Sequence, residues 1–376
     1  MGASAARLPA DVAALLRAGT VIPAHPLALT ERRRLDERHQ RALTRYYVAS
    51  GAGGVAIGVH TTQFAIRDPG VDLYEPVLAL TADALDSAGA GAGAGAGAAG
   101  RPFVRVAGVA GPTAQAVAEA EVAARLGYHA VLLSPPRPHR DDPVLDDPDR
   151  FDDLMIERAA AVGEVLPVIG FYLQTAIRGP RLTLDFWRRF AELDCVVAIK
   201  AAPFDRYRTL DVARAVAGSA RGADIALYTG NDDAIVADLL SDLVFEGPDG
   251  RPVTRHLRGG LLGHWSVWAR RAVDLLAQVE RARTGDREAL ADLVHRSAAI
   301  TDANSALFDP SHGFAGCIAG VHEVLRRQGL LAGTWCLDPD ERLSPGQAEE
   351  IDRVLRLHPW LSDDDFVAEH LDAWLR

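Results

Sequence analysis

The residue that points most directly to chemistry is Lys200, the only lysine among 376 residues. Lysine and arginine together number 40, so every other side chain of these two types is a guanidinium. Lys200 lies in the apolar segment 195–204, CVVAIKAAPF. A buried lysine loses its proton readily, whereas an arginine does not. A neutral amine can attack a carbonyl carbon and form a Schiff base. The sequence therefore predicts a nucleophilic lysine.

The position of Lys200 within its segment supports this interpretation. Alternation along a strand puts Lys200 on the same face as Val196 and Ala198. The residue comes late in the segment, and barrel enzymes keep their catalytic groups at the carboxyl ends of strands. The alternative is an ordinary lysine neutralised by a carboxylate. Such a residue is expected on a polar helix face, where most of the arginines lie.

The elements that must position Lys200 alternate between two patterns. Amphipathic segments such as 113–127 and 183–193 separate short apolar runs. This alternation indicates a parallel sheet, and eight such units fit a (β/α)₈ TIM barrel. A doubly wound open sheet needs fewer strands and a phosphate-binding first turn, which we do not find. The expected strands are 20–29, 54–59, 103–111, 129–136, 167–174, 195–203, 224–232 and 259–265.

Two regions with different roles are expected along the chain. Residues 1–265 supply the barrel strands and the catalytic face, and 266–376 supply the last barrel helix and a C-terminal helical extension. Within the first region, the Gly/Ala-rich stretch 87–100 is typical of a surface loop. The segment 245–256 contains Pro-Asp-Gly, which indicates a hairpin inserted before the last strand.

Composition excludes several kinds of partner. The net charge of −11 argues against nucleic acid, and no apolar run reaches the roughly 18 residues of a membrane helix. The N-terminus shows no signal peptide, and three scattered cysteines favour a reducing cytoplasm. No metal-binding motif is found, so we expect no metal site.

Longer motifs resemble a known family. VLPVIGFYLQTAIRG followed by LDCVVAIKAAPFD is similar to the dihydrodipicolinate synthase / N-acetylneuraminate lyase family of Schiff-base aldolases. The resemblance extends over about residues 18–355 and indicates a divergent member of this family. It implies a (β/α)₈ barrel with C-terminal helices, no cofactor beyond a covalent lysine imine, and a homo-oligomer, either dimer or tetramer. The implied substrate is pyruvate or another 2-oxo acid, together with an aldehyde where the reaction is an aldol addition.

The resemblance also implies residue roles. Lys200 matches the imine-forming lysine, and Tyr172, 28 residues earlier, matches a tyrosine that moves protons. The family's Gly-Thr-Thr-Gly-Glu loop corresponds to the segment starting at His60. Thr61 and Thr62 are then expected to bind a substrate carboxylate or to pass a proton to Tyr172. Capping of the loop is the alternative role of these threonines. His60 is either an extra acid or base or a structural histidine.

Further candidates lie near the ends of other strands. The segment TGNDD places Gly230 at the family's glycine-rich seventh strand, and His264 lies near the end of the eighth. Both residues are expected to contact the substrate. Arg178 lies one residue after the position that corresponds to the family's carboxylate-binding arginine, and it is the candidate to bind the substrate carboxylate. Asp232 and Asp233 either bind a polar substrate group or cap the next helix, and capping is the favoured role.

Departures from the family pattern limit the assignment of a substrate. Ser134, Pro135 and Pro136 stand where dihydrodipicolinate synthases have tyrosines, so we do not expect that activity. Two function classes stay open. The first is a Schiff-base lyase, aldolase or dehydratase acting on a 2-oxo acid. The second is a non-catalytic protein that binds or senses a 2-oxo acid on the same scaffold.

Overall fold

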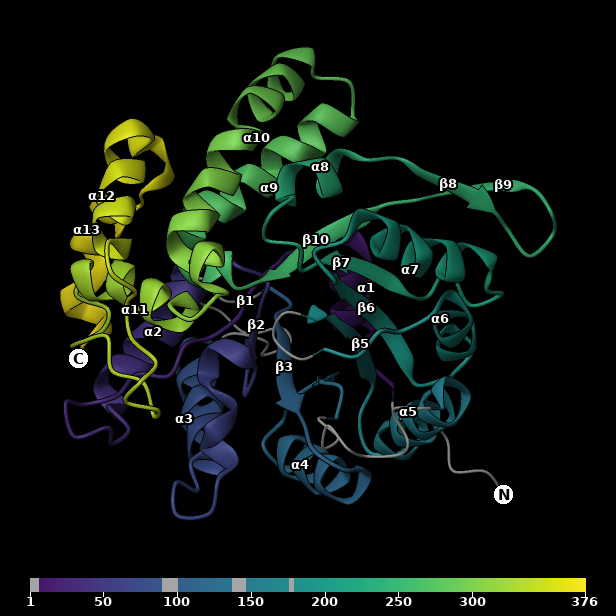
Figure 1. The fold of residues 1–376 in the computed structure, drawn as a ribbon, viewed down its shortest axis with the longest axis horizontal. Coiled ribbons are helices and arrows are strands. Elements are labelled where there is room, and N and C mark those ends of the chain that lie inside the picture. The colour runs from purple at the N-terminus through teal and green to yellow at the C-terminus, as the bar shows by residue number, and fades with distance from the viewer. Residues whose placement is uncertain (1–6, 90–100, 137–146, 176–178) are drawn as a thin grey trace.

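Eight parallel strands alternate with helices and close into a barrel, as expected (Figure 1). The computed structural model describes residues 7–89, 101–136, 147–175 and 179–376. The barrel strands are β1 (Val21–Pro23), β2 (Gly54–Ile57), β3 (Val104–Val109), β4 (Ala130–Leu133), β5 (Val168–Leu173), β6 (Val196–Ala202), β7 (Ala226–Thr229) and β10 (Leu257–Leu262). All eight fall within or overlap the segments predicted from the sequence.

The strand order follows the chain and closes the sheet on itself. Each strand pairs in parallel with its neighbours, and β10 lies between β7 and β1. A parallel bridge between Ala24 and Ala56 joins β1 to β2 and completes the ring. Because all strands run in the same direction, their carboxyl ends meet at one end of the barrel, where the connecting loops form the site.

The first strand is shorter than the expected segment 20–29. Pro23 and Pro26 lack the N–H that a central strand must donate, so the ladder ends at Pro23. The chain beyond it is held in other ways. The N–H of His25 donates to the carbonyl of Ala56. In the loop after β2, the hydroxyl of Thr61 donates to the carbonyl of Ala24, and that of Thr62 donates to the carbonyl of His25.

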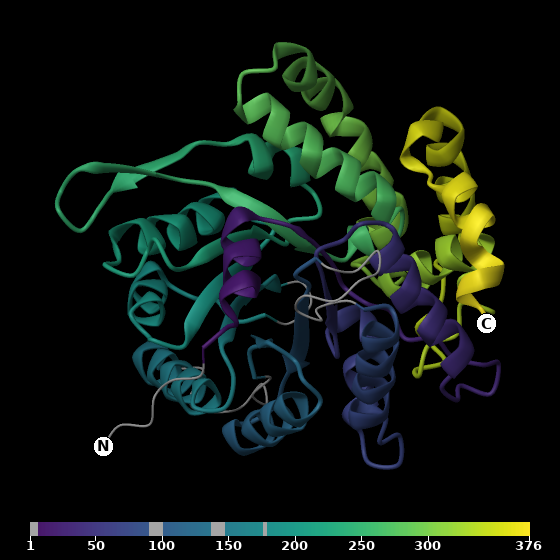
Figure 2. The ribbon, with the colours of Figure 1, turned by 180° about the vertical axis from the view of Figure 1, so that it is seen from behind.

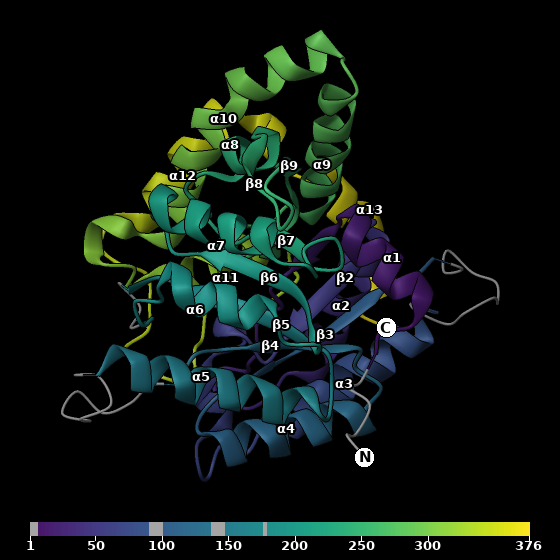
Figure 3. The same cartoon turned by 90° about the vertical axis from the view of Figure 1, so that its right-hand side faces the viewer.

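Two apolar layers hold the barrel together. Inward-facing side chains such as Ile22, Val106 and Ala198 fill the interior of the barrel. The helix α1 (Ala10–Ala18) covers the amino end of the barrel with Val12 and Leu16 (Figure 2). A second layer lies between the strands and the outer helices. Among these helices, α4, α5, α6 and α7 lie side by side around the barrel (Figure 3). The helices that surround or close the barrel are α1 (Ala10–Ala18), α2 (Glu37–Ala49), α3 (Tyr74–Ser87), α4 (Thr113–Arg125), α5 (Pro148–Gly163), α6 (Leu184–Ala191), α7 (Arg206–Gly218), α8 (Ile235–Leu240) and α9 (Ala269–Arg283).

The C-terminal helices gather on one side of the barrel, around a third apolar cluster (Figure 1). They are α10 (Arg287–Phe308), α11 (Cys317–Arg327), α12 (Gln347–Leu357) and α13 (Asp364–Trp374). A separate antiparallel hairpin, β8 (Leu243–Glu246) and β9 (Pro252–Arg255), precedes β10. Among the described residues, none of the helices combines the length and apolar character needed to cross a bilayer.

Candidate active site

Lys200 is held inside the barrel near its carboxyl end. It is the fifth residue of β6, and its neighbours on the same face, Ala198 and Ala202, belong to the cluster that fills the lumen. The side chain is buried, with 8% of the residue exposed. Its Nζ lies 4.4 Å from the ring centroid of Phe171, the residue opposite it on β5. Burial lowers the pKa of Lys200, and the negative charge of Asp232 opposes part of that shift. Burial therefore increases the fraction of Lys200 that is neutral and nucleophilic, compared with a free lysine.

Gly230 gives the lysine its room. It directly follows β7, and a Cβ added there would lie 2.4 Å from Lys200 Cε and 2.6 Å from Ala202 Cβ. No real Cβ tolerates such distances, so the lysine side chain runs through space that only glycine leaves open. Gly230, expected from the sequence to bind substrate, lines the cavity and also fixes the path of the lysine side chain.

We expect Gly230→Ala to displace the amine without unfolding the barrel. A misplacement of about 1 Å can reduce a reaction rate by around 10²-fold, and we expect a loss of that order in imine formation. The measurement is the rate of borohydride trapping with an oxo acid. Gly218→Ala, where the nearest atom would lie 3.9 Å away, is the matched control. Equal trapping rates in the two variants would contradict this role of Gly230.

Asp232 brings a carboxylate into the same cavity. It lies two residues after Gly230, it is 5% exposed, and its Oδ1 accepts a hydrogen bond of 2.8 Å from the N–H of His264. Burial raises the pKa of Asp232, while the hydrogen bond from His264 and the charge of Lys200 oppose the shift. The pocket thus moves the pKa values of Lys200 and Asp232 toward each other, which lowers the cost of moving a proton between them. The favoured capping role is wrong, because Ala234 is the N-cap residue of α8.

Buried hydrogen bonds fix the ends of β6 and β7 relative to each other. Asn231 accepts a hydrogen bond from the N–H of Phe204 and donates to Thr209 and to Asp238. Asp238 also accepts from the hydroxyl of Thr229, at 2.6 Å. These contacts connect the segment that follows Lys200 to the segment that carries Asp232. They hold the two reactive groups in a constant relative position.

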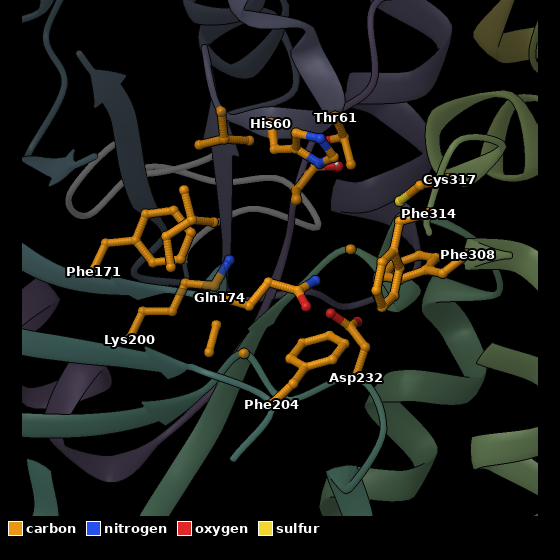
Figure 4. A pocket seen from close by; sticks show the side chains of 16 residues that line it. His60, Thr61, Phe171, Gln174, Lys200, Phe204, Asp232, Phe308, Phe314 and Cys317 are labelled. Atoms are coloured by element: carbon orange, nitrogen blue, oxygen red, sulfur yellow. Dashed lines mark hydrogen bonds between the residues drawn. The ribbon is translucent and has the colours of Figure 1, made fainter. Parts of the chain in front are cut away.

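The cavity around Lys200 has about 580 Å³ of atom-free space, part of it open to solvent. Figure 4 shows Lys200 and Asp232 both pointing into the cavity, with the amide of Gln174 between them in this view. Most of the wall is apolar and includes Val59, Phe171, Leu173, Phe204, Phe308 and Phe314. A few polar groups in an apolar wall are typical of a binding site that orients its ligand.

The C-terminal extension closes one side of this cavity. Phe308 ends α10, Cys317 begins α11, and Phe314 lies in the turn between them (Figure 4). The ring of Phe314 contacts that of Phe204 edge-to-face, with centroids 6.0 Å apart. Both residues have a positive φ, 70° and 52°, which is costly for side chains of this size. Strain of this kind persists only where surrounding contacts enforce it, and it is concentrated at functional sites.

The threonines of the loop after β2 have separate roles. Thr61 lines the cavity, is 3% exposed, and donates its hydroxyl to the carbonyl of Ala24 at 2.9 Å. Thr62 does not line the cavity. Its hydroxyl donates to His25 and accepts the N–H groups of Gly58 and Val59, so it shapes the loop. Substrate binding by Thr62 stays a prediction, and its hydroxyl is already engaged within the loop.

His60, the residue before Thr61, also lines the cavity (Figure 4). Its imidazole centroid lies 6.1 Å from that of Phe64.

Tyr172 does not lie in the cavity, contrary to expectation. It is opposite Ala201 in the strand pairing, whereas Phe171 is opposite Lys200. Because adjacent residues of a strand face opposite sides, the Tyr172 ring lies outside the barrel, 5.5 Å from Trp187 of α6. Its hydroxyl donates to the carbonyl of Leu182 at 3.0 Å. The place beside the lysine is taken by Phe171, which has no proton to transfer.

Two other predicted site residues remain. The ring of His264 faces a different cavity, beside Trp268, and burial lowers its pKa to about 4. Its backbone N–H donates to Asp232, so His264 reaches the site through its backbone, and a substrate contact of its side chain stays a prediction. Arg178 lies outside the described residues. Among the described residues, no group of three histidine, cysteine or acidic side chains is arranged to hold a metal ion.

Comparison with known proteins adds a structural likeness. No protein-family model matches the sequence, and no curated protein matches it significantly. Solved structures do match, although sequence identity is low. Dihydrodipicolinate synthase from Oceanobacillus iheyensis is 18% identical, with a TM-score of 0.68 over 93% of this chain and 100% of that one.

Two further structures show the same likeness. N-acetylneuraminate lyase from Fusobacterium nucleatum is 15% identical, with a TM-score of 0.65 over 91% of this chain and 99% of that one. Dihydrodipicolinate synthase from Acinetobacter baumannii, solved with pyruvate, is 18% identical, with a TM-score of 0.66 over 90% and 98%. The chain therefore has the fold of these proteins, and the resemblance drawn from sequence motifs is confirmed at that level.

Proposed function

We propose that the protein is a Schiff-base lyase or aldolase acting on pyruvate or another 2-oxo acid. The observation that carries this proposal is the buried, unique Lys200, whose amine points into a cavity at the carboxyl end of the barrel. Solved proteins of the same fold are a synthase complexed with pyruvate and an N-acetylneuraminate lyase complexed with pyruvate, which supports the same substrate class.

The site supplies the steps that imine chemistry requires. The neutral amine of Lys200 attacks the keto carbon, and the resulting carbinolamine loses water to give the imine. Water leaves only if its oxygen is protonated, and Asp232, with its raised pKa, is the acid we assign to that step. The imine then serves as the electron sink for loss of a proton or a carbon fragment from the adjacent carbon, so no other cofactor is needed.

Among the described residues that line the cavity there is no tyrosine, which supports a reaction other than that of a dihydrodipicolinate synthase. Phe171 faces Lys200, and Ser134 and Pro135 follow β4 where a relay tyrosine is expected. We therefore propose a different reaction, in which Asp232 replaces the tyrosine hydroxyl as the proton-transfer group. The presence of Phe171 rather than a tyrosine beside Lys200 also favours the second candidate function, a protein that binds a 2-oxo acid without turning it over.

Hydrogen exchange separates these two functions. A lyase of this class must remove a proton from the carbon next to the imine, so in D₂O we expect the methyl signal of pyruvate, or the C3 signal of a longer 2-oxo acid, to decay in proton NMR spectra. The decay should depend on Lys200 and stop in Lys200→Met. A protein that forms the imine but exchanges no proton would be a binder, and the proposal of a lyase would be wrong.

A further inference from the structure

A second cavity lies beside the lysine site at the same end of the barrel. Its walls come from the loops after β2, β3 and β4 and from α5, and it has about 1380 Å³ of atom-free space, part of it open to solvent. The side chain of Leu173, at the end of β5, lines both this cavity and the one that contains Lys200. The two cavities are therefore adjacent, with Leu173 between them.

Arg158 of α5 is an unusual group in this wall. The residue is 1% exposed, and its Nε donates to the carbonyl of Gly111 at 3.0 Å. Within the described residues, neither Nη1 nor Nη2 has a hydrogen-bond partner. Burial lowers the pKa of Arg158 to about 10, but the guanidinium still carries its charge at neutral pH. A buried charge without partners is costly, so it indicates a ligand of opposite charge.

The nearby carboxylate does not neutralise Arg158. Both oxygens of Glu119 accept from Nε of Arg67 at 3.0 Å, and they also accept from Gln115 and from the N–H of Ala110. This carboxylate is thus matched by the charge of Arg67, and the charge of Arg158 is left in excess. An acidic residue that does line the cavity, Asp68, is exposed to solvent, where its charge is screened.

Other unsatisfied donors face the same space. The hydroxyl of Ser134, buried after β4, has no partner among the described residues, and neither has Nη1 of Arg67. The N-terminus of α4, a helix of 13 residues, opens on the cavity at Thr113 and favours negative charge there. These groups can all donate hydrogen bonds, and the fork of Arg158 matches an oxyanion in shape.

We propose that Arg158 and Ser134 form an oxyanion subsite that binds a carboxylate or phosphate group at the far end of the substrate. This inference rests on the proposed function, because it assigns the substrate a second anionic group remote from the keto carbon that reacts with Lys200. No local sequence pattern singles out Arg158, because it lies on a helix rather than at the end of a strand.

The test is anion binding in Lys200→Met protein, where no imine can form. Titration calorimetry with inorganic phosphate and with succinate at low ionic strength should show binding of at least one. The tighter of the two identifies the group as phosphate or carboxylate. Adding Arg158→Met should weaken binding at least tenfold, while Arg150→Met, which removes an exposed arginine of the same helix, should leave it unchanged.

Stability distinguishes this subsite from a structural role of Arg158. Without anion, Arg158→Met should melt at the same or a higher temperature, because it removes an unpaired buried charge. Ser134→Ala, which deletes one hydroxyl, should fold normally and still weaken anion binding severalfold. The proposal is overturned if neither probe binds, or if the Arg158→Met and Ser134→Ala proteins bind as tightly as their parent. Failure of Lys200 to form an imine would leave this outcome unaffected.

Discussion

Replacing Lys200 by methionine is expected to abolish turnover while leaving the barrel folded. Methionine fills the same channel beside Gly230 but cannot form an imine. Removal of a covalent nucleophile can cost on the order of 10⁴-fold or more in kcat, and we expect a loss of that size. The folded state should be at least as stable as the wild type, because a desolvated amine is replaced by an apolar side chain.

The two readouts together make the result specific. Thermal unfolding checks that the fold survives, and a steady-state assay with the 2-oxo acid that exchanges hydrogen fastest checks activity. Retention of more than about one hundredth of wild-type turnover would exclude covalent catalysis by this residue. A loss of both activity and stability would instead indicate that Lys200 has a structural role.

Asp232→Asn is expected to have the second largest effect. Asparagine keeps an oxygen that accepts the N–H of His264 but can no longer move a proton. General acid–base groups contribute about 10²–10⁴-fold, so we expect kcat to fall by that factor. Tyr172→Phe is the matched control. It should lower stability by about 1 kcal/mol through the lost hydrogen bond to Leu182 and leave turnover nearly unchanged. The reverse ranking of these two variants would return the catalytic role to Tyr172.

The pH profile of Asp232→Asn provides a second check. Trapping requires the neutral amine, so its rate rises with pH through the pKa of Lys200. Burial lowers that pKa, so the wild-type rise should be complete below the ~10.4 of a free lysine. The charge of Asp232 raises the same pKa, so its removal should move the rise to still lower pH. An unchanged profile would mean that the two groups do not interact.

Much of the fold could be predicted from the sequence because its signals are local and repeated. Apolar runs bounded by turns, each followed by an amphipathic helix, identified all eight barrel strands. The predicted boundaries were wrong at the ends of strands, where a single residue can determine the point at which the strand stops. Pro23 stops the first strand early, and the last strand ends at Leu262, after which the chain turns into a short 3₁₀ helix at His264.

The site was harder to predict, since it depends on which face a side chain takes. Every residue of β5 is buried, so hydrophobicity could not show that Phe171 faces inward and Tyr172 outward. The strand pairing between β5 and β6 also shifts register once, between Val168 and Ile169, and a count of residues cannot reveal such a shift. Lys200 was identifiable because its residue type is unique in the chain.

Groups far apart in sequence formed the rest of the site. Phe308, Phe314 and Cys317 come from the C-terminal extension, more than 100 residues after Lys200, and no motif connects them to it. Asp232 was noticed but assigned to a helix cap, because its burial and its proximity to the amine emerge only when β6 and β7 pair. The positions of these residues in the site therefore depend on contacts between distant segments, which local sequence patterns do not reveal.

The most direct test of the account is a reduction experiment on the wild-type protein. The chain is incubated with a panel of 2-oxo acids, including pyruvate, and then treated with borohydride. Intact mass and peptide mapping are read for an adduct. We predict one adduct, on Lys200, and none in Lys200→Arg. Because this lysine is the only one, the terminal amine is the sole other amine that can react in this way. Absence of an adduct with every oxo acid, or equal labelling of Lys200→Arg, would contradict the central claim.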